Sequence, residues 1–369
     1  MRIAIDCRKI RDYGIGTYIE NLVLNLVRID TRNEYVLLCF ESDAERLGAV
    51  CPLKIVTAGL YSVAELLAIS KAIGTCHADL FHSPHYVIPY FLPCPAVVTL
   101  HDIIHLLYPE NLPGLPARLY ARHFIRRAVS VATAVITVSD SSRADILGRF
   151  PAATNRVYRV YNGVDPNFST NGEPEKADRP YFLSVGNNKP HKNLSLILDA
   201  YARFSSNHDG IDLVLTGTGP LPDQPLPPGI RALGYIDKNH LARLYRGSLA
   251  LICASRYEGF GLPAVEAQAS GTPVIASGIP VFLETLGTSA TFFKQGEISD
   301  LVAAMKRLAL NAHLRSDLGE KGIENASRFS FDACARETLA IYEAVAIGHI
   351  SEKAGRQRKR RNAKEEPDK

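Results

Sequence analysis

The chain has 369 residues, of which 46% are hydrophobic and 22% are charged, and these values exclude a protein that is disordered or fibrous over most of its length. This length suits two domains of ordinary size. The net charge is +4, and residues 352–369 account for all of it, with eight Lys or Arg against four Asp or Glu. A nearly neutral body argues against a nucleic-acid-binding core, so no nucleic acid is expected as a partner.

The seven cysteines and the N-terminus indicate the compartment. The cysteines are scattered and never form C-x-x-C, which is typical of a reducing compartment. The first residues run directly into a strand pattern, without the apolar segment of a signal peptide. No apolar run approaches the ~20 residues of a membrane-spanning helix. We therefore expect a cytoplasmic protein which, if it works at a membrane, lies on the inner face of the cell membrane.

The first half alternates between short apolar runs and helical patterns. Strands are predicted at residues 2–6, 35–40, 79–82, 96–100 and 134–138, and helices at 18–28, 62–73 and 118–131. Ser139 or Asp140 is expected to cap the next helix. Strands that alternate with helices at this spacing predict a parallel sheet with helices on both faces.

The pattern stops and then restarts. Residues 165–180 are rich in turn-forming residues and read as a linker. Strands are then predicted at 181–185, 213–216, 249–253 and 273–276, with helices at 194–204, 264–269 and 332–347. The fold class is therefore α/β, with two doubly wound domains. We assign residues 1–168 and 178–330 to these domains, 331–350 to a C-terminal helix and 351–369 to a flexible basic tail.

The basic tail has two interpretations. It is either a disordered, solubilising end or a polybasic segment centred on residues 356–361 that binds an anionic membrane surface.

A glycine-rich segment, Gly14-Ile15-Gly16-Thr17, follows the first strand and opens a helix. Glycines let a backbone approach a ligand closely, and a helix N-terminus offers free N–H groups to an anion. The segment could cradle a diphosphate, or it could be an ordinary tight turn, because G-x-G alone is not specific.

Histidines gather at predicted strand ends. His82 and His101 each end a strand, and ligands of open α/β sheets bind at that edge. Both side chains are therefore expected to face a cleft. His101, together with Asp102, could contact a sugar hydroxyl or position the reacting centre, and His85 could shape the acceptor side.

The competing interpretations of these histidines are a zinc site and ordinary loop residues. His101 and His105 are four residues apart, but the helical HExxH context is missing, so no metal site is expected. Ordinary hydrogen-bonding roles in loops are expected for His77, His105 and His123.

Two glutamates occupy the most informative stretch, residues 255–271. Pro263 and Gly271 suit the start and end of a helix over residues 263–270, which places Glu266 on its first turn and Glu258 in the preceding loop. Phosphate would lie at the helix start, and a carboxylate can accept two vicinal hydroxyls, as ribose is commonly held. The alternative, a solvated surface pair, fits poorly beside the apolar loop that runs from Gly259 into the helix.

Glu258 and Glu266 are separated by seven residues, and this spacing resembles the E-x7-E motif of retaining GT-B glycosyltransferases, in particular glycosyltransferase family 4. Further landmarks follow in the family's order: GIGT, VSDSS, VYNGVD, FLSVGNNKPHKNL, LTGTGP, EGFGLPAVEAQASGTPVIAS and FSF. The resemblance covers most of the chain. It implies the GT-B fold, in which two Rossmann-like domains face a deep cleft.

The resemblance also implies roles for particular residues. Lys192 would contact the donor diphosphate, Glu266 the ribose hydroxyls and Glu258 the hydroxyls of the donor sugar. Gly16 would pack its backbone against the phosphates from the other domain, and His101 would lie near the reacting sugar.

The loop before the second glutamate has an implied role as well. The backbone at Phe260, Gly261 and Leu262 would help to hold phosphate and sugar. The family's last helix crosses back to the N-terminal domain, and residues 331–350 would do so here.

One position departs from the family pattern. Many relatives carry Arg where this chain has Asn187, and others carry it where this chain has His191. The second cation that usually faces the diphosphate is therefore not evident. Lys189 or a partly protonated His191 are the substitutes that the sequence offers.

The function implied is transfer of a hexose, with retention of configuration and front-face attack, from a nucleotide sugar to a glycan or lipid-linked acceptor in polysaccharide biosynthesis. The resemblance to enzymes that build bacterial polysaccharides favours mannose from GDP-mannose. No Asp-x-Asp occurs to clamp a divalent ion, so a metal-independent enzyme without a cofactor is expected. The alternatives are a catalytically silent nucleotide-sugar-binding subunit and a GT-B sugar-nucleotide epimerase.

Overall fold

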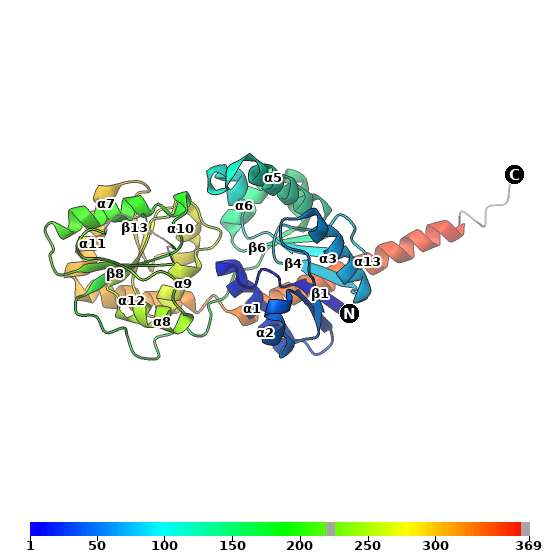
Figure 1. Cartoon of the computed structure of the whole chain (residues 1–369), viewed down its shortest axis with the longest axis horizontal. Coiled ribbons are helices and arrows are strands. Elements are labelled where there is room, and N and C mark those ends of the chain that lie inside the picture. The colour runs from blue at the N-terminus through cyan, green and yellow to red at the C-terminus, as the bar shows by residue number, and fades with distance from the viewer. Residues whose placement is uncertain (218, 220–225, 363–369) are drawn as a thin grey trace.

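The computed structural model describes residues 1–217, 219 and 226–362, which form two α/β domains side by side (Figure 1). Each domain is built on one parallel sheet with helices packed on its faces. Every strand is parallel to its neighbours, because helical segments cross over between them. The predicted fold class, with two Rossmann-like domains, is confirmed.

The N-terminal sheet has the strand order β3-β2-β1-β4-β5-β6-β7. Its strands are β1 Arg2–Asp6, β2 Glu34–Cys39, β3 Leu53–Ile55, β4 Leu80–Ser83, β5 Ala96–Thr99, β6 Ala134–Thr137 and β7 Val157–Arg159. Its helices are α1 Tyr13–Ile29, α2 Ala44–Gly48, α3 Val63–Thr75, α4 Ile104–Leu107, α5 Gly114–Val131 and α6 Asp140–Arg149. The central strands β5 and β6 are buried along their whole length, which explains their uninterrupted small and apolar residues.

The C-terminal sheet has the strand order β10-β9-β8-β11-β12-β13. Its strands are β8 Tyr181–Val185, β9 Asp212–Thr216, β10 Ile230–Ala232, β11 Ala250–Cys253, β12 Val274–Ser277 and β13 Thr291–Phe293. Its helices are α7 Leu194–Ser205, α8 Lys238–Gly247, α9 Leu262–Ala269, α10 Pro280–Leu286, α11 Ile298–Leu310 and α12 Ala312–Ala326. The chain reverses its direction of sheet growth between β8 and β11, and in the first sheet between β1 and β4. Ligands of open α/β sheets bind beyond the carboxyl ends of strands at such switch points.

The last helix, α13 Phe331–Asn362, returns to the N-terminal domain. Cys334, Ala335 and Tyr342 are buried in the same cluster as the apolar face of α1. A Cβ on Gly163 would lie 2.1 Å from the backbone nitrogen of Phe331, so the glycine of the NGVD segment lets the returning chain pass. Residues 351–362, which the sequence assigned to the tail, continue the helix, whereas 363–369 lie outside the described residues.

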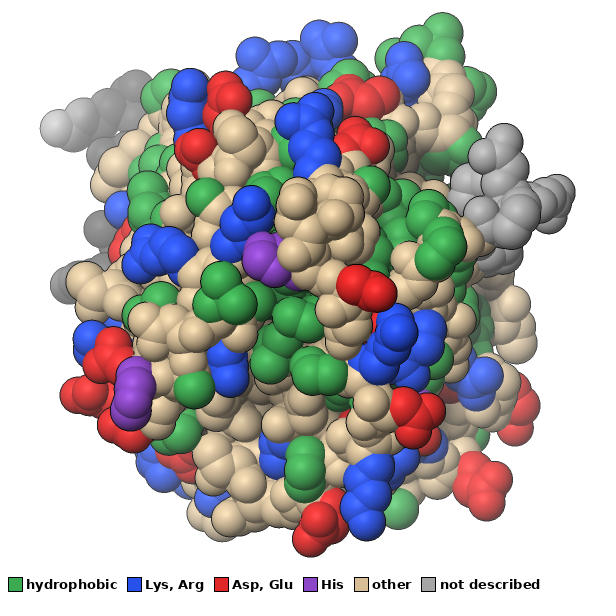
Figure 2. All heavy atoms as spheres, turned by 90° about the vertical axis from the view of Figure 1, so that its left-hand side faces the viewer, with side chains coloured by type: hydrophobic (Ala, Val, Ile, Leu, Met, Phe, Trp, Pro, Cys, Tyr) green, Lys and Arg blue, Asp and Glu red, His purple; other side chains and the backbone are tan. Residues whose placement is uncertain are grey.

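The surface of the C-terminal domain mixes both signs of charge. Figure 2 shows the end of the molecule that this domain forms, where acidic and basic side chains are interspersed with apolar and neutral polar ones. This mixture agrees with the nearly neutral body. Within the described chain, no helix combines the length and the apolar character needed to cross a membrane.

Candidate active site

The loop that carries the first glutamate turns sharply into α9 at Gly261. Its φ is +91°, and a Cβ there would lie 2.6 Å from Cε1 of Phe282, so the turn requires glycine. Helix α9 begins at Leu262, one residue earlier than predicted. Glu266 is therefore the fifth helical residue and not, as expected, on the first turn.

Lys192 and Glu258 form an ion pair at the switch point of the C-terminal sheet. Nζ of Lys192 lies 2.6 Å from Oε1 of Glu258, and the hydroxyl of Ser255 donates to the same oxygen at 2.6 Å. Both side chains line a hollow beyond the ends of β8 and β11, with Gly186 and Asn187 on its rim. Gly186 has a φ of +147°, which favours glycine, and a Cβ there would make only ordinary van der Waals contact with the Lys192 stem at 3.7 Å.

The pair is charged on both sides. Burial is the largest single influence and favours the neutral form of Glu258, but the charge of Lys192 and the hydrogen bonds from Lys192 and Ser255 together outweigh it and lower the pKa of Glu258 below its usual value. Glu258 in turn outweighs burial and raises the pKa of Lys192. The hollow therefore contains one cation and one anion. The cation can bind a negatively charged group of a ligand, and the anion can accept hydrogen bonds from hydroxyl groups.

Glu266 lies apart from this hollow. It is 7% exposed, and Oε2 accepts a hydrogen bond from the hydroxyl of Tyr245 on α8 at 3.2 Å. Burial raises its pKa to about 7. The structure thus brings Lys192 and Glu258 together and holds Glu266 on another side of α9, and the ribose role of Glu266 stays a prediction.

The apolar loop residues have structural explanations. Phe260 is buried between the rings of Tyr161 and Phe329. Its side chain anchors the loop against these two rings. Leu262 contacts the other domain, since a Cβ on Gly14 would lie 3.5 Å from its Cδ1.

Gly16 is required by its own chain. A Cβ there would lie 2.2 Å from the carbonyl oxygen of Ile10, so this glycine, which lies in the first turn of α1, lets the preceding loop pack closely against the helix. Tyr13, which immediately precedes this segment, reaches the other domain, where its hydroxyl contacts the hydroxyl of Tyr235. Contact between Gly16 and phosphate stays a prediction.

His101 and Asp102 approach the glutamate loop from the N-terminal domain. Nε2 of His101 lies 3.2 Å from the carbonyl oxygen of Pro84, and burial lowers the pKa of this histidine to about 4. A Cβ on Gly259 would lie 2.8 Å from Oδ2 of Asp102. Burial and then the charge of Glu258 raise the pKa of Asp102 to about 6. The two domains therefore meet where the sequence placed the reacting centre.

The expectation for His82 is wrong. Its side chain is fully buried and contacts the hydroxyls of Thr99 and Tyr342, so it joins α13 to the sheet and does not face the cleft. Burial lowers its pKa to about 3. His105 is half-buried against the ring of Tyr86. Among the described residues, no group of three or more His, Cys, Asp or Glu is arranged to hold a metal ion.

His191 and Lys189, the two residues that the sequence offers in place of the family's arginine, differ in charge. His191 is buried, and its Nδ1 lies 3.2 Å from Oδ1 of Asn111. Burial lowers its pKa to about 4, so it is neutral near pH 7 and is not the second cation. Lys189 is exposed beside Asn187.

Helix α6 holds the glutamate loop from the opposite domain. The hydroxyls of Ser139 and Ser142 donate to the carbonyl oxygen of Gly259 at 2.7 and 3.1 Å. The hydroxyl of Tyr257 donates to Asp145 at 3.0 Å. The loop on both sides of Glu258 is therefore tied to α6.

Of the contacts between α6 and the glutamate loop, the sequence predicted only the residue that caps α6. Ser139 caps α6 as predicted, because its side chain accepts a hydrogen bond from the backbone of Ser142. The two contacts to Gly259 join residues more than 100 positions apart, and no local signal reveals them. The S-x-x-S spacing, which puts two hydroxyls on one side of a helix start, was the available hint.

Comparison with known proteins decides the family. The model of Glycosyl transferases group 1 matches residues 167–325, and that of Glycosyltransferase Family 4 matches residues 13–168. The chain belongs to glycosyltransferase family 4. This glycosyltransferase carries the Lys192–Glu258 pair in its group 1 segment and Asp102 in its family 4 segment.

Two curated relatives of this glycosyltransferase are bacterial. O-antigen chain mannosyltransferase B of Escherichia coli is 26% identical over 285 residues, covering 72% of this chain and 74% of the relative. O-antigen chain mannosyltransferase RfbU of Salmonella typhimurium is 29% identical over 249 residues, covering 66% and 68%. The fold is similar to that of Anabaena Alr3699/HepE in complex with UDP and glucose, with a TM-score of 0.74, 18% identity, and 93% and 100% of the two chains covered.

Proposed function

We propose that this glycosyltransferase transfers mannose from GDP-mannose, with retention of configuration, to a glycan or lipid-linked acceptor in polysaccharide biosynthesis. The observation that carries the proposal is the ion pair of Lys192 and Glu258 at the switch point of the C-terminal sheet, with Asp102 beside it. The mannosyltransferase names of the bacterial relatives support the choice of sugar.

The ion pair suits a donor that carries both a diphosphate and a sugar. A diphosphate would draw Lys192 away from Glu258, and the freed carboxylate would accept hydroxyls of the sugar. The leaving diphosphate gains negative charge as its bond to the sugar breaks, so Lys192 stabilises the transition state more than the ground state. In the free enzyme, Lys192 and Glu258 compensate each other, so neither charge is partly buried without a partner of opposite sign.

The remaining parts of the donor are assigned by resemblance. Glu266 would accept the ribose hydroxyls in place of the Tyr245 hydroxyl that it accepts now. The backbone at Phe260, Gly261 and Leu262 would face phosphate and sugar. His101 would lie near the reacting sugar, and its neutral ring would donate or accept a hydrogen bond without adding charge.

Metal independence is part of the proposal. The chain has no Asp-x-Asp, and Lys192 offers a positive charge where a divalent ion would otherwise neutralise the diphosphate. The acceptor would attack from the face that the diphosphate leaves. No cofactor is required by this scheme.

The decisive test is release of nucleoside diphosphate from UDP-, GDP-, ADP- and dTDP-sugars in EDTA, with and without lipid-linked acceptors. Acceptor-dependent release of GDP from GDP-mannose is expected, and proton NMR of the product should show the α-anomer of the donor retained. Glu258→Gln and Lys192→Met should lose this activity, whereas Lys321→Met, an exposed lysine of α12, should keep it. Release that depends on added Mg²⁺, or an inverted product, contradicts the mechanism.

The same assay separates the alternatives. A catalytically silent subunit, which the departures at Asn187 and His191 would favour, binds a nucleotide sugar and releases nothing with any acceptor. An epimerase converts the sugar without an acceptor.

Membrane contact through the basic tail is also a proposal, because the side chains of residues 356–361 lie outside the described part of the structure. A surface within the described residues also supports contact with an anionic membrane. Helix α5 has four arginines and no acidic residue, and it exposes Leu115 and Leu119. Binding to vesicles with anionic lipid should fall when residues 351–369 are deleted, and binding that is unchanged refutes the role of the tail.

A further inference from the structure

A series of buried hydrogen bonds runs from the last helix to the residue that packs against His101. The hydroxyl of Tyr342 on α13 contacts Nδ1 of His82, and Nε2 of His82 lies 2.8 Å from the hydroxyl of Thr99 at the end of β5. The same Thr99 hydroxyl lies 3.0 Å from the hydroxyl of Tyr18 on α1. The ring of Tyr18 packs against the ring of His101, with centroids 4.8 Å apart and ring planes at 88°. We call Tyr342, His82, Thr99 and Tyr18 the buried network.

The buried network reaches the cleft only at His101. Resting on the proposed function, in which His101 lies near the reacting sugar, we propose that Tyr18 is a positioning residue for His101 and that the buried network anchors Tyr18 to α13. All side chains of the network are fully buried, so none of them can contact a ligand in the cleft. They act on the reaction through the His101 ring. Helix α13, which returns from the C-terminal domain, thereby takes part in building the site.

The hydrogen bonds of the network are mutually compatible. Burial lowers the pKa of His82 to about 3, so its ring is neutral. A neutral imidazole has one donor and one acceptor nitrogen, and it can therefore serve Tyr342 and Thr99 at the same time. A buried hydroxyl without a partner is unfavourable, so each of these contacts favours one arrangement of its neighbours. The hydroxyl of Tyr18 is thus held at a defined place.

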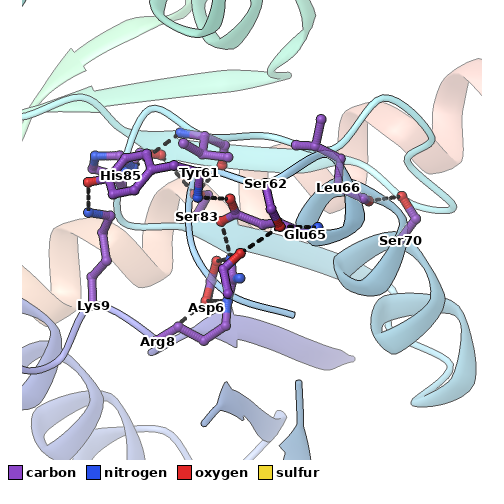
Figure 3. Close-up of polar contacts among 12 residues, drawn as sticks. Asp6, Arg8, Lys9, Tyr61, Ser62, Glu65, Leu66, Ser70, Ser83 and His85 are labelled. Carbon is purple, nitrogen blue, oxygen red and sulfur yellow. Dashed lines mark hydrogen bonds and ion pairs between the residues drawn. The ribbon is translucent and has the colours of Figure 1, made fainter. Parts of the chain in front are cut away.

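His101 is held from a second side by the loop that follows β4. Its Nε2 lies 3.2 Å from the carbonyl oxygen of Pro84, and a carbonyl only accepts, which assigns the ring proton to Nε2. Figure 3 shows Ser83 and His85, the residues on either side of Pro84. Oγ of Ser83 lies 2.8 Å from the carbonyl oxygens of both His85 and Val87, and this contact holds the loop that presents the Pro84 carbonyl.

The two contacts together fix the direction of an acceptor. With the proton on Nε2, the other ring nitrogen of His101, Nδ1, has a free lone pair, and none of the described residues donates a hydrogen bond to it. This lone pair lies in the plane of the ring. The bond to Pro84 fixes one atom of the ring but still allows the plane to turn about that bond. Packing against Tyr18 opposes this rotation, so Nδ1 keeps one orientation toward a sugar hydroxyl.

Kinetics of single and double variants test the proposal with GDP-mannose and an acceptor. Tyr18→Leu, which removes the ring, should lower kcat about tenfold to a hundredfold, the effect of misplacing a group at the reacting centre. Tyr342→Phe, which removes one hydroxyl of the network, should lower kcat about threefold. Affinity for GDP, which carries no sugar, should not change in either variant. In a His101→Ala background, Tyr18→Leu should cause no further loss, because a positioning residue acts only through the residue that it positions.

Tyr35→Phe is the matched control. Tyr35 is buried in the same apolar cluster as Tyr18 and Tyr342, and the substitution removes a hydroxyl that donates to Asp30 at 2.7 Å. This variant should lose stability like the variants of the network and keep the wild-type kcat. An equal loss of kcat in Tyr35→Phe would assign the effects to general loosening of the core and would overturn the proposal.

A spectroscopic readout keeps the test independent of the donor. In NMR spectra of isotope-labelled histidine, assigned with His101→Ala, the His101 resonance should shift in Tyr18→Phe and Tyr342→Phe but not in Tyr35→Phe. These substitutions keep every ring, so a shift reports movement and not the loss of a neighbouring ring current. The proposal is overturned if the His101 resonance stays in place in both variants of the network, or if Tyr18→Leu lowers kcat equally with and without His101. If no nucleotide sugar yields a diphosphate, the proposed function fails, and the NMR result alone decides whether Tyr18 positions His101.

Discussion

Glu284 on α10 joins the C-terminal domain to Asp140 at the start of α6 in the other domain. The backbone N–H of Asp140 donates to Oε1 at 2.7 Å, and that of Ser141 donates to Oε2 at 2.8 Å. A carboxylate at a helix N-terminus satisfies free N–H groups and interacts favourably with the helix dipole. Because α6 also holds Gly259, both the Glu284 carboxylate and the loop that carries Glu258 are bound to the start of the same helix of the other domain.

Glu284→Gln should therefore lower kcat/KM about tenfold, the equivalent of ~1.4 kcal/mol, because one of the two charge-assisted bonds is lost. Affinity for GDP, which binds on the C-terminal domain in our proposal, should change little. Steady-state kinetics and GDP titration measure both quantities. Glu297→Gln, an exposed glutamate on the same domain, is the matched control. An equal loss of GDP affinity would argue for a general structural defect.

Lys192→Met should lower kcat by about 10²–10³, the range for removing one group that stabilises developing negative charge. The double variant with Glu258→Gln should be less impaired than the sum of the two single effects, because the pair in the free enzyme is broken once only. Single-turnover rates of the three variants give this coupling. Strict additivity would mean that the two residues act independently.

Glu266 should make stability depend on pH. Its pKa is about 7 in the folded chain, against an ordinary value of 4.5, because the carboxyl is buried. The folded state then binds more protons than the unfolded state between pH 4.5 and about 7, so the free energy of unfolding falls as pH rises through this window, by at most ~3 kcal/mol. Urea unfolding of the wild type and Glu266→Gln across this range should show a flatter profile for the variant. Parallel profiles would refute the assignment.

Gly261→Ala should destabilise the chain by about 1–3 kcal/mol and impair activity, since alanine disfavours the φ of +91° and its methyl group would meet Phe282. Thermal unfolding and GDP release measure the two effects. Gly59→Ala is the control, because its Cβ would meet no atom within 4 Å and its φ is not positive. A variant at Gly261 with wild-type stability would show that the turn relaxes easily.

Local sequence patterns determined the architecture of this protein. Apolar runs marked β1 and β8 with their observed bounds, Ser139 identified the start of α6, and Pro263 placed the start of α9 within one residue. These signals act over one turn or one strand, where side-chain periodicity and backbone preferences dominate. The same patterns missed the edge strands β3, β7, β10 and β13, since three residues are too few to display a period.

Only the tertiary structure decided which charges and histidines meet. Lys192 and Glu258 are 66 positions apart, and Arg8 and Glu65 are 57 apart, yet both pairs are in direct contact. His82 and His101 both follow apolar strands, but packing of α13 buries the first and leaves the second beside the glutamate loop. Burial and the approach of opposite charges set the pKa of such groups, and both depend on how distant segments pack, which no local pattern encodes.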